Sequence, residues 1–145
     1  MPTDLGPKYS TDWRGKPPHM LAPDQPVWYR FLDQAAPQFL SLYYDCLLGG
    51  PTLTGSDIQD PMKRMWRAVT SKRADAIAET QTETWLIEVS SYPGMRAIGQ
   101  LLTYRNLWRE DPRIKKPTKM VLVADDFDPD IMSTLTLMDI SLHLV

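Results

Sequence analysis

The sequence is poor in the residues that build covalent cross-links and zinc sites. It contains one cysteine, Cys46, and two histidines among 145 residues. One cysteine cannot form an internal disulfide, and this set is too small for an ordinary zinc site. Cys46 lies in an apolar, strand-like run, so we expect a buried structural thiol and not a nucleophile.

Long apolar runs are also missing. No stretch approaches the roughly 20 apolar residues that a membrane-spanning helix needs. The first residues, MPTDLGPKYS, lack the basic start and the apolar centre of a signal peptide. We therefore expect a protein without a membrane partner or a signal peptide, located in the cytoplasm or in a soluble assembly.

Neither sign of charge dominates, because the formal net charge is only −2. The distribution is nevertheless uneven: residues 124–139 contain five aspartates and no base, whereas residues 61–74 contain five basic residues and no acid. The basic set is Lys63, Arg64, Arg67, Lys72 and Arg73. The asymmetry favours either a basic surface for a nucleic-acid backbone or copies that join head to tail; two solvated faces of a neutral domain are an equally valid interpretation.

Proline is concentrated near the N-terminus. Six of the thirteen prolines lie in residues 1–26, a stretch without helical or alternating apolar periodicity. We predict an extended arm over residues 1–24 with no core of its own, and one domain over residues 25–145. The bulky side chains of the arm are candidates for binding a neighbouring subunit: Tyr9, Trp13, His19, Met20 and Leu21.

The rest of the sequence predicts alternating helices and strands. Helical spacing of apolar residues indicates helices at 25–36, 61–69, 93–110 and from 129 onwards. Strand-like runs lie at 39–48, 73–79, 84–90, 119–124 and in the final ISLHLV. The run KMVLVA (119–124) is typical of a strand that is buried on both faces. This order predicts a three-layer α/β domain, a mixed sheet flanked by helices.

Two neighbouring predicted strands each carry a carboxylate, Asp75 in the first and Glu88 in the second. The next helix carries Gln100 and Tyr104, which project from one face because they lie four residues apart. Acids on adjacent strands are the arrangement with which metal-dependent nucleases hold a divalent cation. Asp75 and Glu88 are therefore candidate metal ligands.

These residues resemble the PD-(D/E)XK nuclease superfamily, and Gln100 and Tyr104 match the QxxxY signature of its RecB-like branch. The resemblance covers roughly residues 27–145, with specific motif matches only between Asp75 and Tyr104. It implies a restriction-endonuclease-like core in which Asp75 and Glu88 bind Mg²⁺. It also implies that Gln100 and Tyr104 position water or phosphate.

The catalytic lysine of that family is replaced. Glu88-Val89-Ser90 stands where the motif has Glu-X-Lys, so Ser90 occupies the lysine position. Loss of one transition-state stabiliser commonly costs on the order of 10² to 10³ in rate. Arg96, one helical turn before Gln100, is the best substitute cation, but arginine stays protonated and is a poor proton shuttle. We therefore expect a vestigial site without catalysis and without a cofactor.

Two classes of function follow. The first is a non-catalytic assembly subunit on a degenerate nuclease fold, a homo-oligomeric component of a tailed-bacteriophage virion (capsid, neck or tail connector) that docks through its arm. The alternative is a Mg²⁺-dependent RecB-like DNA nuclease, or a module that binds DNA without cleaving it. The missing lysine, the arm and the charge asymmetry favour the assembly subunit.

Overall fold

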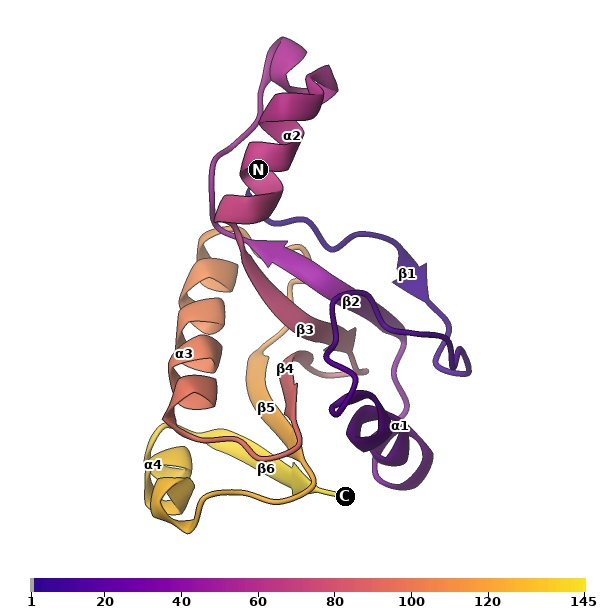
Figure 1. Cartoon of the computed structure of the whole chain (residues 1–145), viewed down its shortest axis with the longest axis vertical. Helices are drawn as coiled ribbons and strands as arrows, with labels where there is room; N and C mark the ends of the chain where they lie inside the picture. Colours follow the sequence, from indigo (N-terminus) through magenta and orange to yellow (C-terminus); the bar gives the residue numbers. More distant parts are fainter. Residues whose placement is uncertain (1) are drawn as a thin grey trace.

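A six-stranded sheet lies at the centre of the computed structural model, which describes residues 2–145 (Figure 1). Its strands are β1 (Lys8–Tyr9), β2 (Ser41–Leu48), β3 (Lys72–Glu79), β4 (Thr84–Ser90), β5 (Thr118–Ala124) and β6 (Ile140–Leu144). Their order in the sheet is the order of the chain. Strands β1 to β4 are antiparallel neighbours, whereas β4, β5 and β6 run parallel. The sheet is therefore mixed and open, as the sequence predicts.

Helices cover both faces of this sheet (Figure 1). The helices are α1 (Gln25–Gln34), α2 (Pro61–Thr70), α3 (Met95–Glu110) and α4 (Met132–Leu137), with short 3₁₀ turns η1 (Gly55–Gln59) and η2 (Pro129–Ile131). α1 lies on one face, α3 and α4 lie on the other, and α2 projects from one end of the molecule. Within residues 2–145, no helix combines the length and the apolar character required to cross a bilayer. The predicted α/β class with flanking helices is confirmed.

The two faces bury separate apolar clusters. Trp28 and Phe31 of α1 are fully buried on one side, and Leu101 and Trp108 of α3 are almost fully buried on the other. Residues of β5 alternate between the two clusters, Val121 and Val123 facing α1 while Met120 and Leu122 face α3. The continuous apolar run 119–124 thus reflects burial on both faces, as predicted.

The ends of the helices follow local sequence signals, with small differences from prediction; α1 ends at Gln34 instead of residue 36, and α2 ends at Thr70 instead of residue 69. Asp60 accepts a hydrogen bond from the Met62 N–H (2.9 Å) and caps α2, whose first residue is a proline. α3 begins at Met95 instead of residue 93. The helix predicted from residue 129 starts with η2, where Asp128 caps the Asp130 N–H (3.0 Å), and continues as α4.

The N-terminal arm packs along the outer edge of the sheet, beside β2. Strand β1 pairs with Leu42 and Tyr43, and Asp4 exchanges two backbone hydrogen bonds of 2.9 Å with Leu47. The rings of Tyr9 and Trp13 lie against each other and against Tyr44. The arm has no core of its own, but it uses the surface of the domain that follows it.

The candidate anchor residues of the arm therefore divide into two groups. Tyr9, Trp13 and Met20 pack against their own domain. His19 and Leu21 are exposed. Only these two side chains are presented to solvent for a partner, and partner binding by the arm stays a prediction.

Replacing Met20 by alanine tests whether the arm packs on its own domain in solution. Met20 is 5% exposed, and its truncation should lower the free energy of unfolding by about 2 to 5 kcal/mol, because the side chain leaves a cavity in the cluster around α1. The neighbouring Leu21 is 69% exposed, so Leu21→Ala should change stability by less than about 0.5 kcal/mol. Urea unfolding measures both, and equal effects of the two variants would contradict the packing described.

Candidate functional site

Asp75 and Glu88 lie next to each other where β3 and β4 separate. Regular pairing of these strands ends at Ala76 and Ile87, so that Asp75 and Glu88 are the next positions outward. Asp75 Oδ2 accepts a hydrogen bond from the Val89 N–H at 2.8 Å. The Asp75 carboxylate thus substitutes for a backbone acceptor at the point where the strands diverge.

Burial controls the protonation of this pair. Glu88 is buried, and its Oε1 has no hydrogen-bond partner within the described part of the chain. Burial raises the pKa of both carboxyl groups, and the charge of Asp75 raises the pKa of Glu88 further. The hydrogen bond from Val89 opposes the shift at Asp75. At neutral pH the pair therefore retains one proton, carried mainly by Glu88.

Two further aspartates surround the pair, and sequence reasoning missed both. Asp24 and Asp45 line the same cavity of about 380 Å³ as Asp75 and Glu88. Asp24 is buried, its Oδ1 accepts the Ser91 N–H at 2.9 Å, and burial raises its pKa. Asp24 stands at the start of α1, where its side chain makes no capping hydrogen bond. From the sequence, Asp24 is recognisable only as the start of a helix. Its hydrogen bond with Ser91 joins residues that are far apart in the chain, and local patterns do not predict such a contact.

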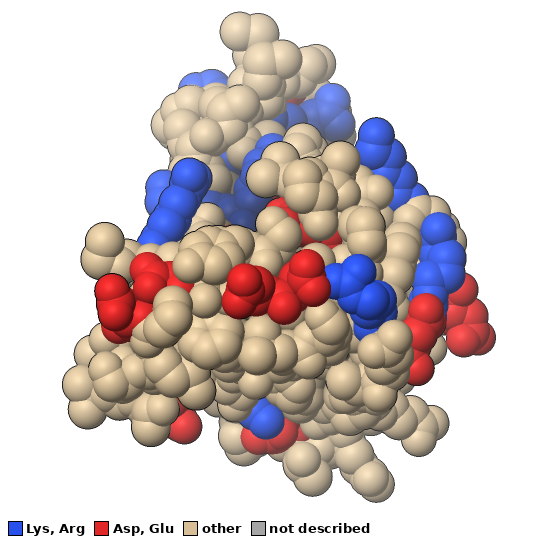
Figure 2. Space-filling view, turned by 60° about the horizontal axis from the view of Figure 1, so that its bottom comes forward, with Lys and Arg blue, Asp and Glu red and all other residues tan. Residues whose placement is uncertain are grey.

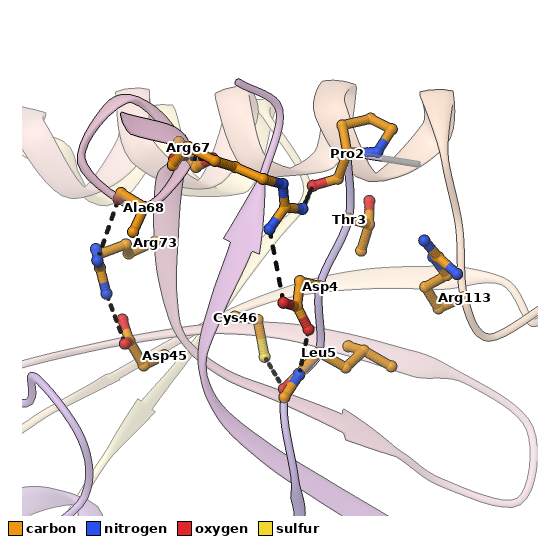
Figure 3. Close-up of polar contacts among 12 residues, drawn as sticks. Pro2, Thr3, Asp4, Leu5, Asp45, Cys46, Arg67, Ala68, Arg73 and Arg113 are labelled. Carbon is orange, nitrogen blue, oxygen red and sulfur yellow. Dashed lines mark hydrogen bonds and ion pairs between the residues drawn. The ribbon is translucent and has the colours of Figure 1, made fainter. Parts of the chain in front are cut away.

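Asp45 interrupts the otherwise apolar strand β2. Its Oδ2 lies 2.6 Å from Arg73 Nη1 and 3.5 Å from His19 Nε2 (the Arg73 contact is drawn in Figure 3). Arg73 also donates to the Ala68 carbonyl at 3.1 Å. A lone acid in the run SLYYDCLL is the same kind of signal that singled out Glu88, so the sequence did contain a sign of Asp45.

Helix α3 supplies the opposite wall. Arg96 and Gln100 line the cavity. Tyr104 is buried one turn further along, and burial together with the nearby Glu88 and Asp75 raises its pKa. The structure thus brings the two acids together with Gln100 of the motif and with Arg96, the predicted substitute cation, and Tyr104 of the motif lies near the acids but outside the cavity lining.

The lysine position of the motif lies at the rim of this cavity. Ser90 ends β4 and lines the cavity. The cationic lining residues are Arg73 and Arg96, and within residues 2–145 no lysine lines it. Arg73 is paired with Asp45, which leaves the exposed Arg96 as the cation available to a ligand.

Two of the carboxylates in this cavity are engaged within the chain, and Mg²⁺ binding stays a prediction of the nuclease alternative. In the described part of the chain, no three or more Asp, Glu, His or Cys side chains form a group that could hold a metal ion. Mg²⁺ prefers several oxygen ligands around one point. Here the Asp75 carboxylate accepts the Val89 N–H, and the Asp45 carboxylate is paired with Arg73.

The candidate nucleic-acid-binding residues differ in their surroundings. Arg67 is buried, and Arg73 is bound to a carboxylate, so both guanidinium groups are engaged within the chain. Lys63, Arg64 and Lys72 are exposed. Contact of this set with a nucleic-acid backbone stays a prediction.

Comparisons with known proteins gave no match: no protein-family model, no curated protein and no solved structure is detectably similar to this chain. The resemblance to PD-(D/E)XK nucleases thus depends on the motif residues and on the mixed sheet alone.

The protonated pair predicts an unusual dependence of stability on pH. The folded chain keeps a proton on Glu88 that the unfolded chain releases, so stability should fall as pH rises from the ordinary pKa of glutamate toward the raised value. The slope for one proton is about 1.4 kcal/mol per pH unit. Glu88→Gln, which is neutral at every pH, should flatten this fall and stabilise the protein at neutral and alkaline pH.

Urea unfolding between acidic and alkaline pH measures this effect. The control is Glu110→Gln, because Glu110 is exposed at the end of α3 and its replacement should leave the slope unchanged. If the wild-type protein instead becomes more stable as pH rises from the ordinary pKa of glutamate toward the raised pKa of Glu88, the prediction that Asp75 and Glu88 retain a proton is wrong.

Proposed function

We propose that this protein is a non-catalytic subunit of a protein assembly, in which copies of the chain join head to tail. The observation that carries the proposal is the outward-facing apolar side of α2. Met62, Met65, Trp66 and Val69 recur at helical spacing, and each is between 50% and 72% exposed. A contiguous exposed apolar stripe of this kind marks an interaction site.

The orientation of α2 is inverted relative to an ordinary surface helix. The buried residue of this helix is Arg67, whose guanidinium group donates to the Pro2 carbonyl and lies 3.6 Å from Asp4 Oδ2 (Figure 3). The helix packs mainly against the neighbouring η1 and projects beyond the sheet (Figure 1). Because Arg67 is the residue of α2 that these contacts bury, the apolar stripe is left exposed to solvent.

The acidic end of a second copy is the occupant that fits this stripe. Lys63 and Arg64 are exposed on α2, and the residues from 61 to 74 include no acid. Residues 124–139 contain five aspartates and no base, and their exposed apolar side chains are Met132, Leu137 and Met138. Arg30 pairs with Asp125 at 3.1 Å, and the other four aspartates keep this surface acidic. Each surface thus combines apolar groups with an excess of one charge, and the signs are opposite.

These two surfaces lie at opposite ends of the molecule. α2 projects from the end opposite to α4 (Figure 1), and acidic side chains form a band across the view in which the lower end is turned forward (Figure 2). Two different surfaces make a heterologous contact, which generates a ring or a filament according to the rotation between copies. A symmetric α2–α2 contact would instead bring Lys63 and Arg64 of both copies together.

The carboxyl site supports the non-catalytic part of the proposal. Glu88 carries a proton at neutral pH, Asp75 holds the Val89 N–H, and Ser90 stands at the position that needs a cation. We propose that the domain is a degenerate PD-(D/E)XK nuclease fold that has kept its sheet and lost its reaction. A tailed-bacteriophage virion (capsid, neck or tail connector) is the assembly that we propose, by analogy with virion subunits that combine a small domain with an ordered arm.

The purified protein should not cleave DNA. We expect no cleavage of linear single-stranded or double-stranded DNA with Mg²⁺ or Mn²⁺, because Ser90 stands at the lysine position and the available cation, Arg96, stays protonated and is a poor proton shuttle. Gel electrophoresis after long incubation measures this. Metal-dependent cleavage that disappears in Glu88→Gln would contradict the proposal and support the nuclease alternative.

Two complementary variants test the head-to-tail contact. Trp66→Glu places a charge in the apolar stripe of α2 and leaves the acidic end intact. Leu137→Glu places a charge among the apolar side chains of the acidic end and leaves α2 intact. Each variant alone should sediment as a monomer at concentrations where the wild type associates, since loss of a central interface residue commonly costs more than about 10-fold in affinity. Their mixture should form dimers and nothing larger, because only one competent α2 and one competent acidic end are present.

Analytical ultracentrifugation measures these species, and high salt should weaken the wild-type contact. Leu40→Glu is the matched control, because Leu40 is an exposed leucine outside both surfaces and its replacement should leave association unchanged. Dimers of Leu137→Glu alone would indicate a symmetric α2 contact. A wild type that stays monomeric at high concentration would overturn the proposal.

A further inference from the structure

A second cavity, separate from the carboxyl site, lies between the N-terminal segment and α2. It has a volume of about 730 Å³, within the range of small-molecule sites. Its walls come from residues 3–6, from the end of β2, from η1 and α2, and from the turn after α3. The lining residues are Thr3, Asp4, Leu5, Gly6, Leu47, Leu53, Ile58, Arg64, Arg67 and Arg113.

Three arginines give this cavity a positive wall. Arg67 is buried and held by the Pro2 carbonyl and Asp4, so its guanidinium group is fixed in place. Arg113 lies 3.4 Å from the Asp111 carboxylate. Arg64 is exposed and makes no ion pair within residues 2–145. Asp4 and Asp111 pair with Arg67 and Arg113, so the positive charge of Arg64 is the one that no carboxylate of the described chain offsets.

A buried hydroxyl group without a partner lies on the same wall. Thr3 is 2% exposed, and its backbone N–H donates to Asp111 at 2.9 Å. Its Oγ1 has no hydrogen-bond partner among the described residues. Figure 3 shows Thr3 between Arg67 and Arg113. A buried polar atom is normally satisfied by protein or by ordered water, and an acceptor that enters the cavity can supply the missing partner of this hydroxyl.

The remaining lining residues are aliphatic. Leu5, Leu47, Leu53 and Ile58 provide apolar surface beside the arginines. A ligand that matches both the arginines and the aliphatic residues is an anionic group attached to an apolar organic group. A phosphate monoester carries nearly two negative charges and three acceptor oxygens, which suits several guanidinium groups better than a carboxylate does.

We propose that this cavity binds a small organic phosphate. Arg64, which has no ion-pair partner within residues 2–145, binds the phosphate group directly, and Arg67 and Arg113 add positive charge beside it while they keep their partners in the chain. The Thr3 hydroxyl donates to one of the phosphate oxygens, and the aliphatic residues contact the organic part. The site goes beyond the proposed assembly function: it shares Arg64 with the basic side of α2, but the apolar stripe of α2 and the acidic end of the chain do not line it.

Calorimetric titration with three probes tests the site: phenyl phosphate, inorganic phosphate and phenol. Phenyl phosphate should bind in the millimolar range or more tightly, inorganic phosphate more weakly, and phenol not detectably. Arg64→Gln should weaken phenyl phosphate binding about 10-fold or more, because it removes a charge-assisted contact. Thr3→Val should weaken it several-fold without lowering the urea midpoint, since valine keeps the shape of threonine and removes only the hydroxyl.

Lys63→Gln is the control variant. Lys63 precedes Arg64 in the chain and lies over the Trp66 ring (5.5 Å to its centroid), outside the cavity lining. It should bind phenyl phosphate like the wild type. The proposal is overturned if the wild type binds none of the phosphates, or if Lys63→Gln and Arg64→Gln weaken binding equally. Arg67 is left unchanged in these tests because it also holds the N-terminal segment.

Discussion

The hydrogen bond from the Val89 N–H to the Asp75 carboxylate is the interaction on which the centre of this molecule depends. At this point β3 and β4 stop pairing through their backbones, and a side chain takes over as the acceptor. The separation of the strands leaves room for a cavity at their ends. Glu88 is buried beside Asp75 with one oxygen unsatisfied, and it remains compatible with the fold because it keeps its proton.

The same construction links distant parts of the chain. Asp24 reaches from the start of α1 to the Ser91 N–H, just after β4, and Asp45 is tied to Arg73. Burial of an unpaired carboxylate is unfavourable, and Asp24, Asp45 and Asp75 are each bound by an N–H group or a guanidinium group. A site assembled in this way holds strand ends together, which agrees with the proposed non-catalytic role.

At the opposite end of the sheet, Arg67 has a comparable organising role. Its guanidinium group ties α2 to the start of the chain, through Pro2 and Asp4. This contact has two consequences: the apolar residues of α2 face solvent, and a cavity with a basic wall forms beneath the helix. One buried arginine therefore underlies both the proposed contact between copies and the proposed phosphate site.

Local sequence patterns determined most of the secondary structure and the candidate acid pair. Apolar periodicity, prolines at helix starts and the run KMVLVA are short-range signals, so they predicted the helices, the strands β2 to β6 and the burial of β5 on both faces; they did not predict β1, which forms only where the arm meets β2. The motif placed Asp75, Glu88 and Gln100 correctly on neighbouring elements, because the spacing of residues along strands and helices is fixed by backbone geometry.

Long-range contacts decided the rest. The apolar periodicity of α2 is the same whether its stripe faces the core or solvent, and only the contact between Arg67 and the N-terminal segment set its direction. The places of the arm, Asp24 and Asp45 likewise depended on partners far away in the sequence. The sequence by itself thus determined which elements form and which acids they carry, whereas the tertiary structure decided which side chains are paired, protonated or presented to solvent, because burial and charge pairing exist only once distant segments meet.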